Sequence, residues 1–376
     1  MGLAFSINWD RLYSQKDLAQ TIRLEFGKDI SPHPEPSSFV YNTLMPWNLL
    51  GHEWAVTMLQ RDLAHDRLRH AYLFTGPEGV GKRTLAAEFA RALLCSAAEP
   101  PCNQCRNCTL AAKGAHSDLL TVAPVESGKR VRAEKIKIEP VRQLIYDLTL
   151  KPIEAKRRVA WLLQFDTAND AAMNAFLKTL EEPPANVVIL LTAESTDGLL
   201  PTIVSRCEVF ALRPLPLAAV RDALITRFMV PAERAELLAN LSGGRLGWAV
   251  RMSQDESALE ARAQKLDDLA ALLRASRVDR FAFAERLARE GSLDRIQDTL
   301  DLWVTFWRDV LLASASTTVP LTNLDRAGQI QALAQSIPPA AARQSLAAIR
   351  RTGELLEKNV NTRLALEVLL LDWPRL

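Results

Sequence analysis

Three glycines and a lysine within residues 70–84 have the spacing of a phosphate-binding loop. The segment reads HAYLFTGPEGVGKRT, and its residues from Gly76 to Lys82 fit the pattern GxxxxGK, with Gly79 and Gly81 between them. Glycines permit the tight turn that lets backbone N–H groups surround a phosphate, and the lysine supplies a positive charge for the outer phosphates. The loop therefore predicts a nucleotide site, and the sequence leaves open whether ATP or ADP occupies it.

The metal end of this predicted site departs from the pattern. Arg83 stands where Ser or Thr would hold a magnesium ion, and Thr84 comes one position later, about 100° further round the helix. An ATPase of this type also needs acidic residues after a second strand, to hold magnesium and to polarise water. The candidate strand at 159–162 is followed by leucine and glutamine, and Asp166 comes too late, as a loop or helix-capping residue. We expect impaired magnesium binding and no ATP hydrolysis by the chain alone.

Four of the five cysteines fall in one short segment, as Cys95, Cys102, Cys105 and Cys108. Thiolates at this density, with CxxC turns that let neighbouring sulfurs face one ion, predict a tetrahedral structural zinc site with no open position. Repeated CxxC motifs also serve iron–sulfur clusters and redox chemistry, so another metal and free thiols remain as alternatives. The fifth cysteine, Cys207, is interpreted as a small packed residue.

An alternation of helices and apolar strands over residues 45–212 would position these two sites. The pattern predicts strands at 72–74, 119–123, 158–165 and 187–193, and helices at 53–67, 84–95, 139–149 and 170–180. Such alternation is typical of an α/β fold with a parallel sheet flanked by helices, and ligands bind at the carboxyl ends of its strands. We therefore expect one α/β domain at 45–212, with the cysteine insert at 95–108.

Residues 213–376 are predicted to be helical, without a convincing strand. We divide them into a small helical subdomain at 213–276 and a larger helical domain at 277–376. Trp303 and Trp307 lie four residues apart, on one face of a helix, and are expected in the core or at an interface. The helices are predicted at 217–228, 231–241, 246–252, 259–274, 280–289, 293–315, 324–336, 339–359 and 362–371.

The composition indicates a globular protein of two or three domains. The chain has 376 residues, of which 48% are hydrophobic and 24% charged, and its net charge of +2 excludes a strongly basic surface overall. Because the chain has neither a long apolar run nor the apolar region of a signal peptide, we expect a cytoplasmic protein without membrane contact. Residues 1–44 include a proline-rich linker at 31–38, and we interpret them as a loose extension or as a mis-annotated start before Met45.

Four blocks of the sequence together resemble bacterial clamp-loader subunits, which are AAA+ proteins of the DNA polymerase III holoenzyme. The blocks are HAYLF with its glycine-rich loop, the cysteine insert, NAFLKTLEEPP at 174–184 and LLPTIVSRC at 199–207. The resemblance is strong over 46–215, and NTRLALE at 361–367 is similar to the last helix of the family's collar domain. It implies an AAA+ domain with a zinc insert, then a helical lid and then a helical collar that joins subunits.

Within this family the sequence resembles the delta-prime type, which keeps the zinc insert and the LKTLEEPP and SRC motifs but loses hydrolytic residues. The complete GxxxxGK loop favours the alternative, the ATP-hydrolysing gamma/tau motor type. Near the position of the family's second-sensor arginine, this sequence has only Arg245, which lies two residues out of the expected register. The resemblance implies gamma/tau and delta subunits, the sliding clamp and primer–template DNA as partners. A recombination-factor ATPase and a zinc-dependent DNA-binding adaptor without nucleotide are more distant alternatives.

The resemblance also implies a role for Arg206 of the SRC motif. In the family this arginine reaches across a subunit boundary into a neighbour's ATP site, where an always-charged planar guanidinium stabilises the charge on the transferred phosphate. Without that role, Arg206 would cap a helix or pair with Glu208. Ser205 is expected to cap or orient a helix start at this point. A local basic run is interpreted as a solvated loop or as a DNA contact; it consists of Lys129, Arg130, Arg132, Lys135 and Lys137.

Overall fold

The computed structural model of the chain describes residues 47, 49–124, 135–315, 317, 319–358 and 360–376. The expectations for residues 1–44 and for a start at Met45 lie outside these residues. The same holds for Lys129, Arg130 and Arg132 of the basic run. The domain boundaries drawn from the sequence stay predictions.

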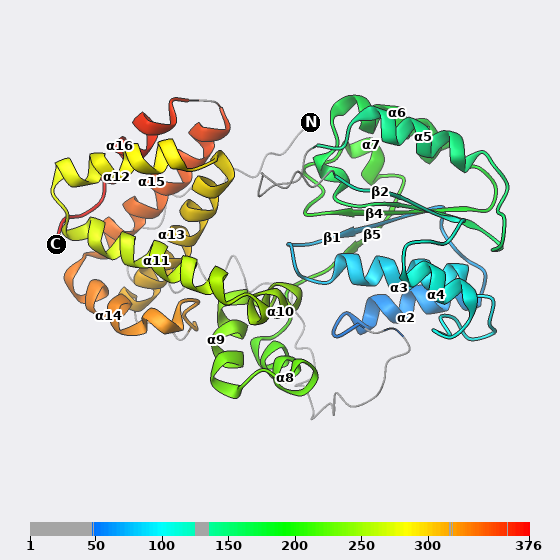
Figure 1. Cartoon of the computed structure of the whole chain (residues 1–376), viewed down its shortest axis with the longest axis horizontal. Coiled ribbons are helices and arrows are strands. Elements are labelled where there is room, and N and C mark those ends of the chain that lie inside the picture. The colour runs from blue at the N-terminus through cyan, green and yellow to red at the C-terminus, as the bar shows by residue number, and fades with distance from the viewer. Residues whose placement is uncertain (1–46, 48, 125–134, 316, 318, 359) are drawn as a thin grey trace. The chain divides into compact units, whose positions relative to one another are not determined.

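Five parallel strands form one sheet in the order β2-β3-β4-β1-β5 (Figure 1). The expected α/β fold with a parallel sheet is therefore confirmed. Strand β4, in which every residue is buried, has the predicted bounds, whereas β5 at the sheet edge was not predicted because its four residues show no long apolar run. The strands are β1 (Ala71–Thr75), β2 (Leu119–Val122), β3 (Arg158–Leu162), β4 (Val187–Ala193) and β5 (Glu208–Ala211).

Helices cover both faces of the sheet, as Figure 1 shows. One of them, α4, lies in the cysteine segment, where the sequence predicted no helix. It follows Cys105, whose sulfur accepts a hydrogen bond from the N–H of Cys108 and so caps the helix. One face carries α2 (Glu53–Ala64), α3 (Lys82–Leu94) and α4 (Arg106–Ala112), and the other carries α5 (Ile138–Leu148), α6 (Asp170–Glu181) and α7 (Pro201–Val204).

Alternate side chains of β1, β3 and β4 enter two separate hydrophobic cores. In β1, Tyr72 and Phe74 pack in the core that contains α2 and α3, whereas Leu73 packs in the core that contains α5, α6 and α7. Successive side chains of a strand point to opposite faces, so a continuous apolar run fills both cores. The strand and the loop after it are thereby held from both sides.

Helices alone follow β5 within the described part of the chain. The helix bounds agree with the predicted ones at α8 and α16, whereas the single helix predicted at 324–336 is divided into a 3-10 turn and a helix. The elements are α8 (Leu217–Phe228), α9 (Ala232–Ser242), α10 (Leu246–Gln254), α11 (Glu256–Arg274), α12 (Arg277–Glu290), α13 (Leu293–Ser314), η3 (Leu324–Arg326), α14 (Ala327–Ser336), α15 (Pro339–Glu357) and α16 (Thr362–Leu371).

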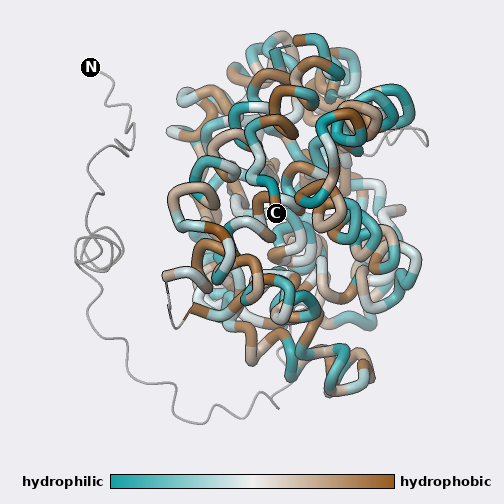
Figure 2. Tube along the Cα trace, turned by 90° about the vertical axis from the view of Figure 1, so that its left-hand side faces the viewer, coloured by the Kyte–Doolittle hydropathy of each residue, from teal (hydrophilic) through white to brown (hydrophobic). Residues whose placement is uncertain are grey.

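The helices α11 to α16 surround one core rich in tryptophan. Trp303 and Trp307 are fully buried, which confirms the expected core position, and their ring centroids lie 4.9 and 5.9 Å from that of Trp373. Hydrophobic and hydrophilic residues alternate along the helical coils (Figure 2). Among the described helices, none is both long enough and apolar enough to cross a membrane.

Arg280 of α12 joins the ends of two other helices. It is buried, and its guanidinium donates to the carbonyl oxygens of Leu272 at 2.9 Å, Leu370 at 2.7 Å and Trp373 at 3.1 Å. The last carbonyls of a helix have no partner within it, and they carry partial negative charge. Arg280 therefore satisfies the carboxyl ends of α11 and α16, although burial lowers its pKa.

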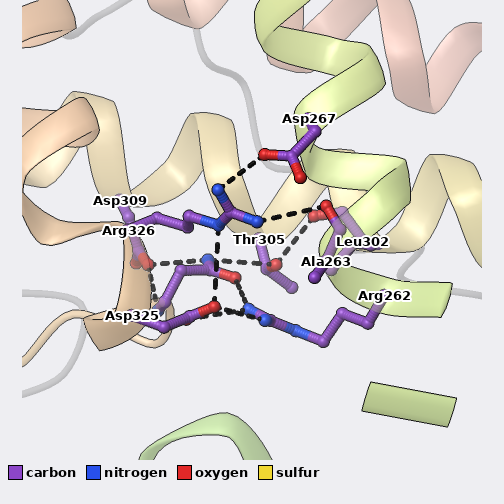
Figure 3. A network of polar contacts seen from close by, with 9 residues as sticks. Arg262, Ala263, Asp267, Leu302, Thr305, Asp309, Asp325 and Arg326 are labelled. Carbon is purple, nitrogen blue, oxygen red and sulfur yellow. Dashed lines mark hydrogen bonds and ion pairs between the residues drawn. The ribbon is translucent and has the colours of Figure 1, made fainter. Parts of the chain in front are cut away.

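A polar network attaches η3 to the helices beside it (Figure 3). Arg262 of α11 donates to the carboxylate of Asp325, at 2.8 Å, and to the side-chain oxygen of Asn323. Asn323 in turn donates to the buried carboxylate of Asp309 in α13, at 2.8 Å, and Arg326 also contacts α11. Because the buried charge of Asp309 is hydrogen-bonded, the network fixes η3 against α11 and α13.

Candidate functional site

The predicted phosphate loop connects β1 to α3. The helix begins at Lys82 rather than at Thr84, and Gly81 is its N-cap residue. The first N–H groups of α3, which have no acceptor within the helix, thus follow the loop directly, as an anion site requires. Gly76 has a φ of 137°, and a Cβ there would come within 2.3 Å of the carbonyl oxygen of Leu212. Only glycine fits this position.

Lys82 bends back onto its own loop. Its Nζ donates to the carbonyl oxygens of Gly76 and Pro77, the latter at 3.0 Å. Burial lowers the pKa of Lys82, and the negative charges of Glu194 and Asp166 act in the opposite direction. The structure thus places the lysine at the loop, where its hydrogen bonds go to carbonyl groups.

Asp166, the acidic residue considered for the metal end, lies in a 3-10 turn (Phe165–Thr167) after β3. One of its carboxylate oxygens accepts the backbone N–H of Glu194 at 2.8 Å, and the other is buried without a hydrogen-bond partner within the described residues. Asp166 therefore links the ends of β3 and β4.

Arg83 and Thr84, the residues beside Lys82, both lie exposed to solvent.

The start of α10 contacts the phosphate loop. The N–H of Gly247 donates to the carbonyl oxygen of Gly79 at 2.8 Å, and Arg251 pairs with Glu78 at 2.7 Å. Gly79 has a φ of 79°, and a Cβ there would lie 2.7 Å from the backbone nitrogen of Trp248. The sequence did not indicate this contact, because it joins residues far apart in the chain.

Arg245, the arginine nearest to the expected second-sensor position, is the N-cap residue of α10. Its guanidinium lies 5.6 Å from the ring centroid of Trp248, and its Nε donates to the carbonyl oxygen of Ser242 at 2.7 Å. Burial lowers the pKa of Arg245, while the charge of Glu78 opposes that shift. The side chain is thus held beside the loop by contacts with its own neighbours.

The four clustered cysteines converge on one point, as predicted. Their sulfur atoms all lie within 4.8 Å of one another. Cys95 is 3.6 Å from Cys102 and 3.9 Å from Cys105, and Cys102 is 4.0 Å from Cys108. Four sulfurs about 2.3 Å from a tetrahedral zinc ion would be separated by about 3.8 Å. The four residues therefore fit a metal ion, and zinc agrees with both the donor set and the spacing.

Backbone N–H groups favour the thiolate form of Cys102 and Cys105, whereas burial raises the pKa of the Cys108 thiol. The N–H of Cys105 donates to Cys102 at 3.3 Å, and that of Cys108 donates to Cys105 at 3.4 Å. Burial raises the pKa of the Cys105 thiol, but hydrogen bonds from backbone N–H groups and from the thiols of Cys102 and Cys108 together outweigh burial and lower it to about 6. Since a thiolate is the form that binds metal, Cys102 and Cys105 are the two ligands whose surroundings favour metal binding before an ion arrives. Cys207 lies elsewhere, packed against the core of α5, α6 and α7.

Arg206 and Ser205 lie in the turn between α7 and β5. Arg206 donates to the carbonyl oxygen of Thr202 at 2.9 Å and pairs with Glu181 at 2.7 Å, rather than with Glu208. Of the two alternatives to the finger role, helix capping is thus correct in part, whereas the pair with Glu208 does not form. Ser205 donates to Thr202 as well and stands at the end of α7, so the expectation of a helix start here is also wrong.

Two family profiles match this chain in separate regions. The profile described as DNA polymerase III, delta subunit, matches residues 51–216, and a second profile, for the C-terminal part of the delta subunit, matches residues 256–375. Together these regions include the phosphate loop, the cysteine cluster, Arg206 and the helices from α11 onward.

Known proteins of DNA polymerase III are similar to the chain. It is 39% identical to subunit delta′ (delta-prime) of Pseudomonas aeruginosa over 54% of the chain and 62% of that protein, so it spans less than two thirds of this relative. It is 29% identical to subunit delta′ of Bacillus subtilis over 84% of the chain and 93% of the relative. It is 33% identical to subunit tau/gamma of Haemophilus influenzae, over 51% of the chain and 27% of that relative.

Proposed function

The chain belongs to the delta-prime family of DNA polymerase III subunits, and we propose that it serves as the delta-prime subunit of a clamp loader. In this proposal it completes a ring of AAA+ subunits together with gamma/tau and delta subunits. The ring places the sliding clamp on primer–template DNA. Such a role in replication implies a cytoplasmic location.

The proposal that this subunit does not hydrolyse ATP rests chiefly on Arg83. An arginine directly after the loop lysine offers no hydroxyl to a magnesium ion, and its positive charge repels one. The hydrogen bonds of Lys82 to Gly76 and Pro77 support the proposal, because they must break before the lysine can hold a phosphate. In this proposal the loop has a structural role and no catalytic one.

We assign Arg206 the role of an arginine finger acting on a neighbouring subunit. The side chain is one-third exposed, and it lies at a turn that two helices support. Glu181 and Thr202 hold its guanidinium at the surface, where a phosphate on another chain could meet it. Ser205 lies next to Arg206 and is assigned a supporting role through its hydrogen bond to Thr202.

Arg206→Ala tests this function in a loader reconstituted from all its subunits. We expect the ATP site that receives the finger to lose about 10³-fold or more of its rate. The DNA-stimulated ATPase rate of the loader should fall by the fraction that this one site contributes to the total, and clamp loading should fail. The matched control is Arg227→Ala, at an exposed arginine of α8. If ATPase and clamp loading are unchanged in the Arg206 variant, the finger role is refuted.

We propose that the cysteine cluster holds a structural zinc ion. The cluster supplies four sulfur ligands, Cys95, Cys102, Cys105 and Cys108, which leaves no position for water or substrate. Bound zinc would join the end of α3 to the start of α4, and it would supply no step of the ATPase reaction.

The complete GxxxxGK loop favours a second candidate, a gamma/tau-type motor subunit of the same complex. The loop geometry supports this alternative, because Gly76 and the start of α3 have the form that a phosphate site requires. The two candidates differ in whether the isolated chain hydrolyses ATP.

A further inference from the structure

Glu181, the last residue of α6, contacts the proposed arginine finger in its own chain. Its Oε1 lies 2.7 Å from Nη2 of Arg206, and the two residues are separated by 25 positions in sequence. The side chains of Arg206 and Glu181 are 33% and 48% exposed. An ion pair this exposed contributes little to the stability of a fold. We therefore ask what the pair contributes to the function of Arg206.

The backbones on both sides of this ion pair are fixed by one core. Leu180, next to Glu181, is buried in the core that also contains Ile203 of α7, and Cys207, next to Arg206, packs against the same core. At its other end, α6 is capped by the side chain of Asn169, which accepts the N–H of Ala172 at 2.8 Å. The carboxylate of Glu181 is therefore presented to Arg206 by a rigid helix end.

The guanidinium of Arg206 has three of its five N–H donors engaged. Nη2 donates to Glu181, and Nη1 donates to the carbonyl oxygen of Thr202 at 2.9 Å and to the hydroxyl of Ser205 at 3.4 Å. Within the described residues, one N–H on Nε and one on Nη2 have no acceptor. The side chain is thus held by one set of donors and offers the other set to an acceptor outside the chain.

We propose that Glu181 is a positioning residue for Arg206, which holds the guanidinium extended at the subunit surface before a neighbour's nucleotide arrives. This inference rests on the proposed finger role of Arg206. A free arginine side chain must lose rotamer freedom when it engages a phosphate, and a side chain that is already held loses less. Glu181 also places a negative charge beside the guanidinium, near the carboxyl end of α6, where positive charge is favoured.

Glu181→Ala tests the proposal in the complete loader. We expect kcat for DNA-stimulated ATP hydrolysis at the site served by Arg206 to fall about threefold to tenfold, with KM for ATP unchanged. Glu181→Gln keeps an oxygen acceptor and should recover part of this loss. The matched control is Glu182→Ala, because Glu182 is exposed in the same turn and, within the described residues, accepts no hydrogen bond from Arg206. Thermal unfolding should be the same for all three variants.

The double variant Glu181→Ala/Arg206→Ala shows whether Glu181 acts through Arg206. We expect it to be no slower than Arg206→Ala alone. If Glu181→Ala leaves kcat unchanged or raises it while Arg206→Ala lowers it, the positioning role is wrong and the finger role stands. If the double variant is slower than Arg206→Ala by the full effect of Glu181→Ala, Glu181 acts by another route and the proposal is also wrong. If Arg206→Ala itself has no effect, both proposals fail.

Discussion

Gly79 illustrates, at the scale of one residue, how the phosphate loop and α10 are joined. Its carbonyl oxygen accepts the N–H of Gly247, and its missing side chain leaves room for the backbone of Trp248. Glycine here is required twice, first by the positive φ and then by the close approach of another helix. The GxxxxGK pattern explains neither requirement, because Gly79 is not one of its fixed positions.

Replacing Gly79 with alanine should destabilise the fold by more than the backbone conformation alone explains. A left-handed φ costs a residue with a side chain about 1–2 kcal/mol, and the Cβ would also meet the nitrogen of Trp248 at 2.7 Å. Gly114→Ala is the matched control, since Gly114 has a φ of 67° and no atom within 4 Å of the added Cβ. Urea unfolding should show the larger loss for Gly79→Ala; equal losses would contradict the contact.

At the scale of elements, the cysteine segment shows how a short helix depends on the residues around it. The helix α4 has seven residues, and Cys105 and Cys108 stand at its start. So short a helix is marginal by itself, and in this chain its first turn is fixed by sulfur contacts with Cys95 and Cys102. A metal ion would therefore supply much of the order of this segment.

We expect about one zinc ion for each chain purified without a chelator. Cys108→Ser should lose most of it, because a buried sulfur ligand is removed and the remaining three leave an open position. Cys207→Ser is the control and should keep the zinc. Metal analysis by mass spectrometry measures the content, and helical signal lost on adding a strong chelator reports the unfolding of the segment. A zinc-free native protein, or equal zinc content in both variants, would refute the site.

At the scale of the whole molecule, the described chain combines a five-stranded parallel sheet with helices that buried polar contacts help to hold together. Arg280 and the network of Arg262, Asn323 and Asp309 use their charges to hold helix ends and η3 in place. Arg206 is one-third exposed in the turn between α7 and β5, which agrees with the proposed finger role. The arrangement suits a subunit that acts on a neighbour.

The isolated chain should therefore hydrolyse ATP no faster than its Lys82→Ala variant. The variant removes the lysine of the predicted phosphate loop and serves as the control for contaminating ATPases. Release of phosphate should be measured with magnesium present, for the chain alone and for the reconstituted loader, and only the loader should respond to DNA. Turnover by the isolated chain that disappears in the Lys82 variant would favour the gamma/tau-type motor.

The sequence predicted most elements, because long apolar runs and helical periodicity are local properties. It placed β4 and α8 within their observed bounds and extended β3 three residues too far. It missed β5 and α4 because each is short, and each depends on partners distant in the chain: β5 pairs with β1, and α4 begins in the cysteine cluster. Local patterns contain no information about such partners.

By itself, the sequence determined the residue types at both sites and hence their chemistry. The GxxxxGK loop with Arg83 predicts a phosphate site with a defective metal end, and four close cysteines predict a metal ligand set. Only the tertiary structure decided which groups these residues meet. Lys82 meets carbonyl groups of its own loop, and Arg206 meets Glu181 rather than Glu208. Partners of a side chain depend on how separate helices and strands pack, and that packing is decided by the cores that they share.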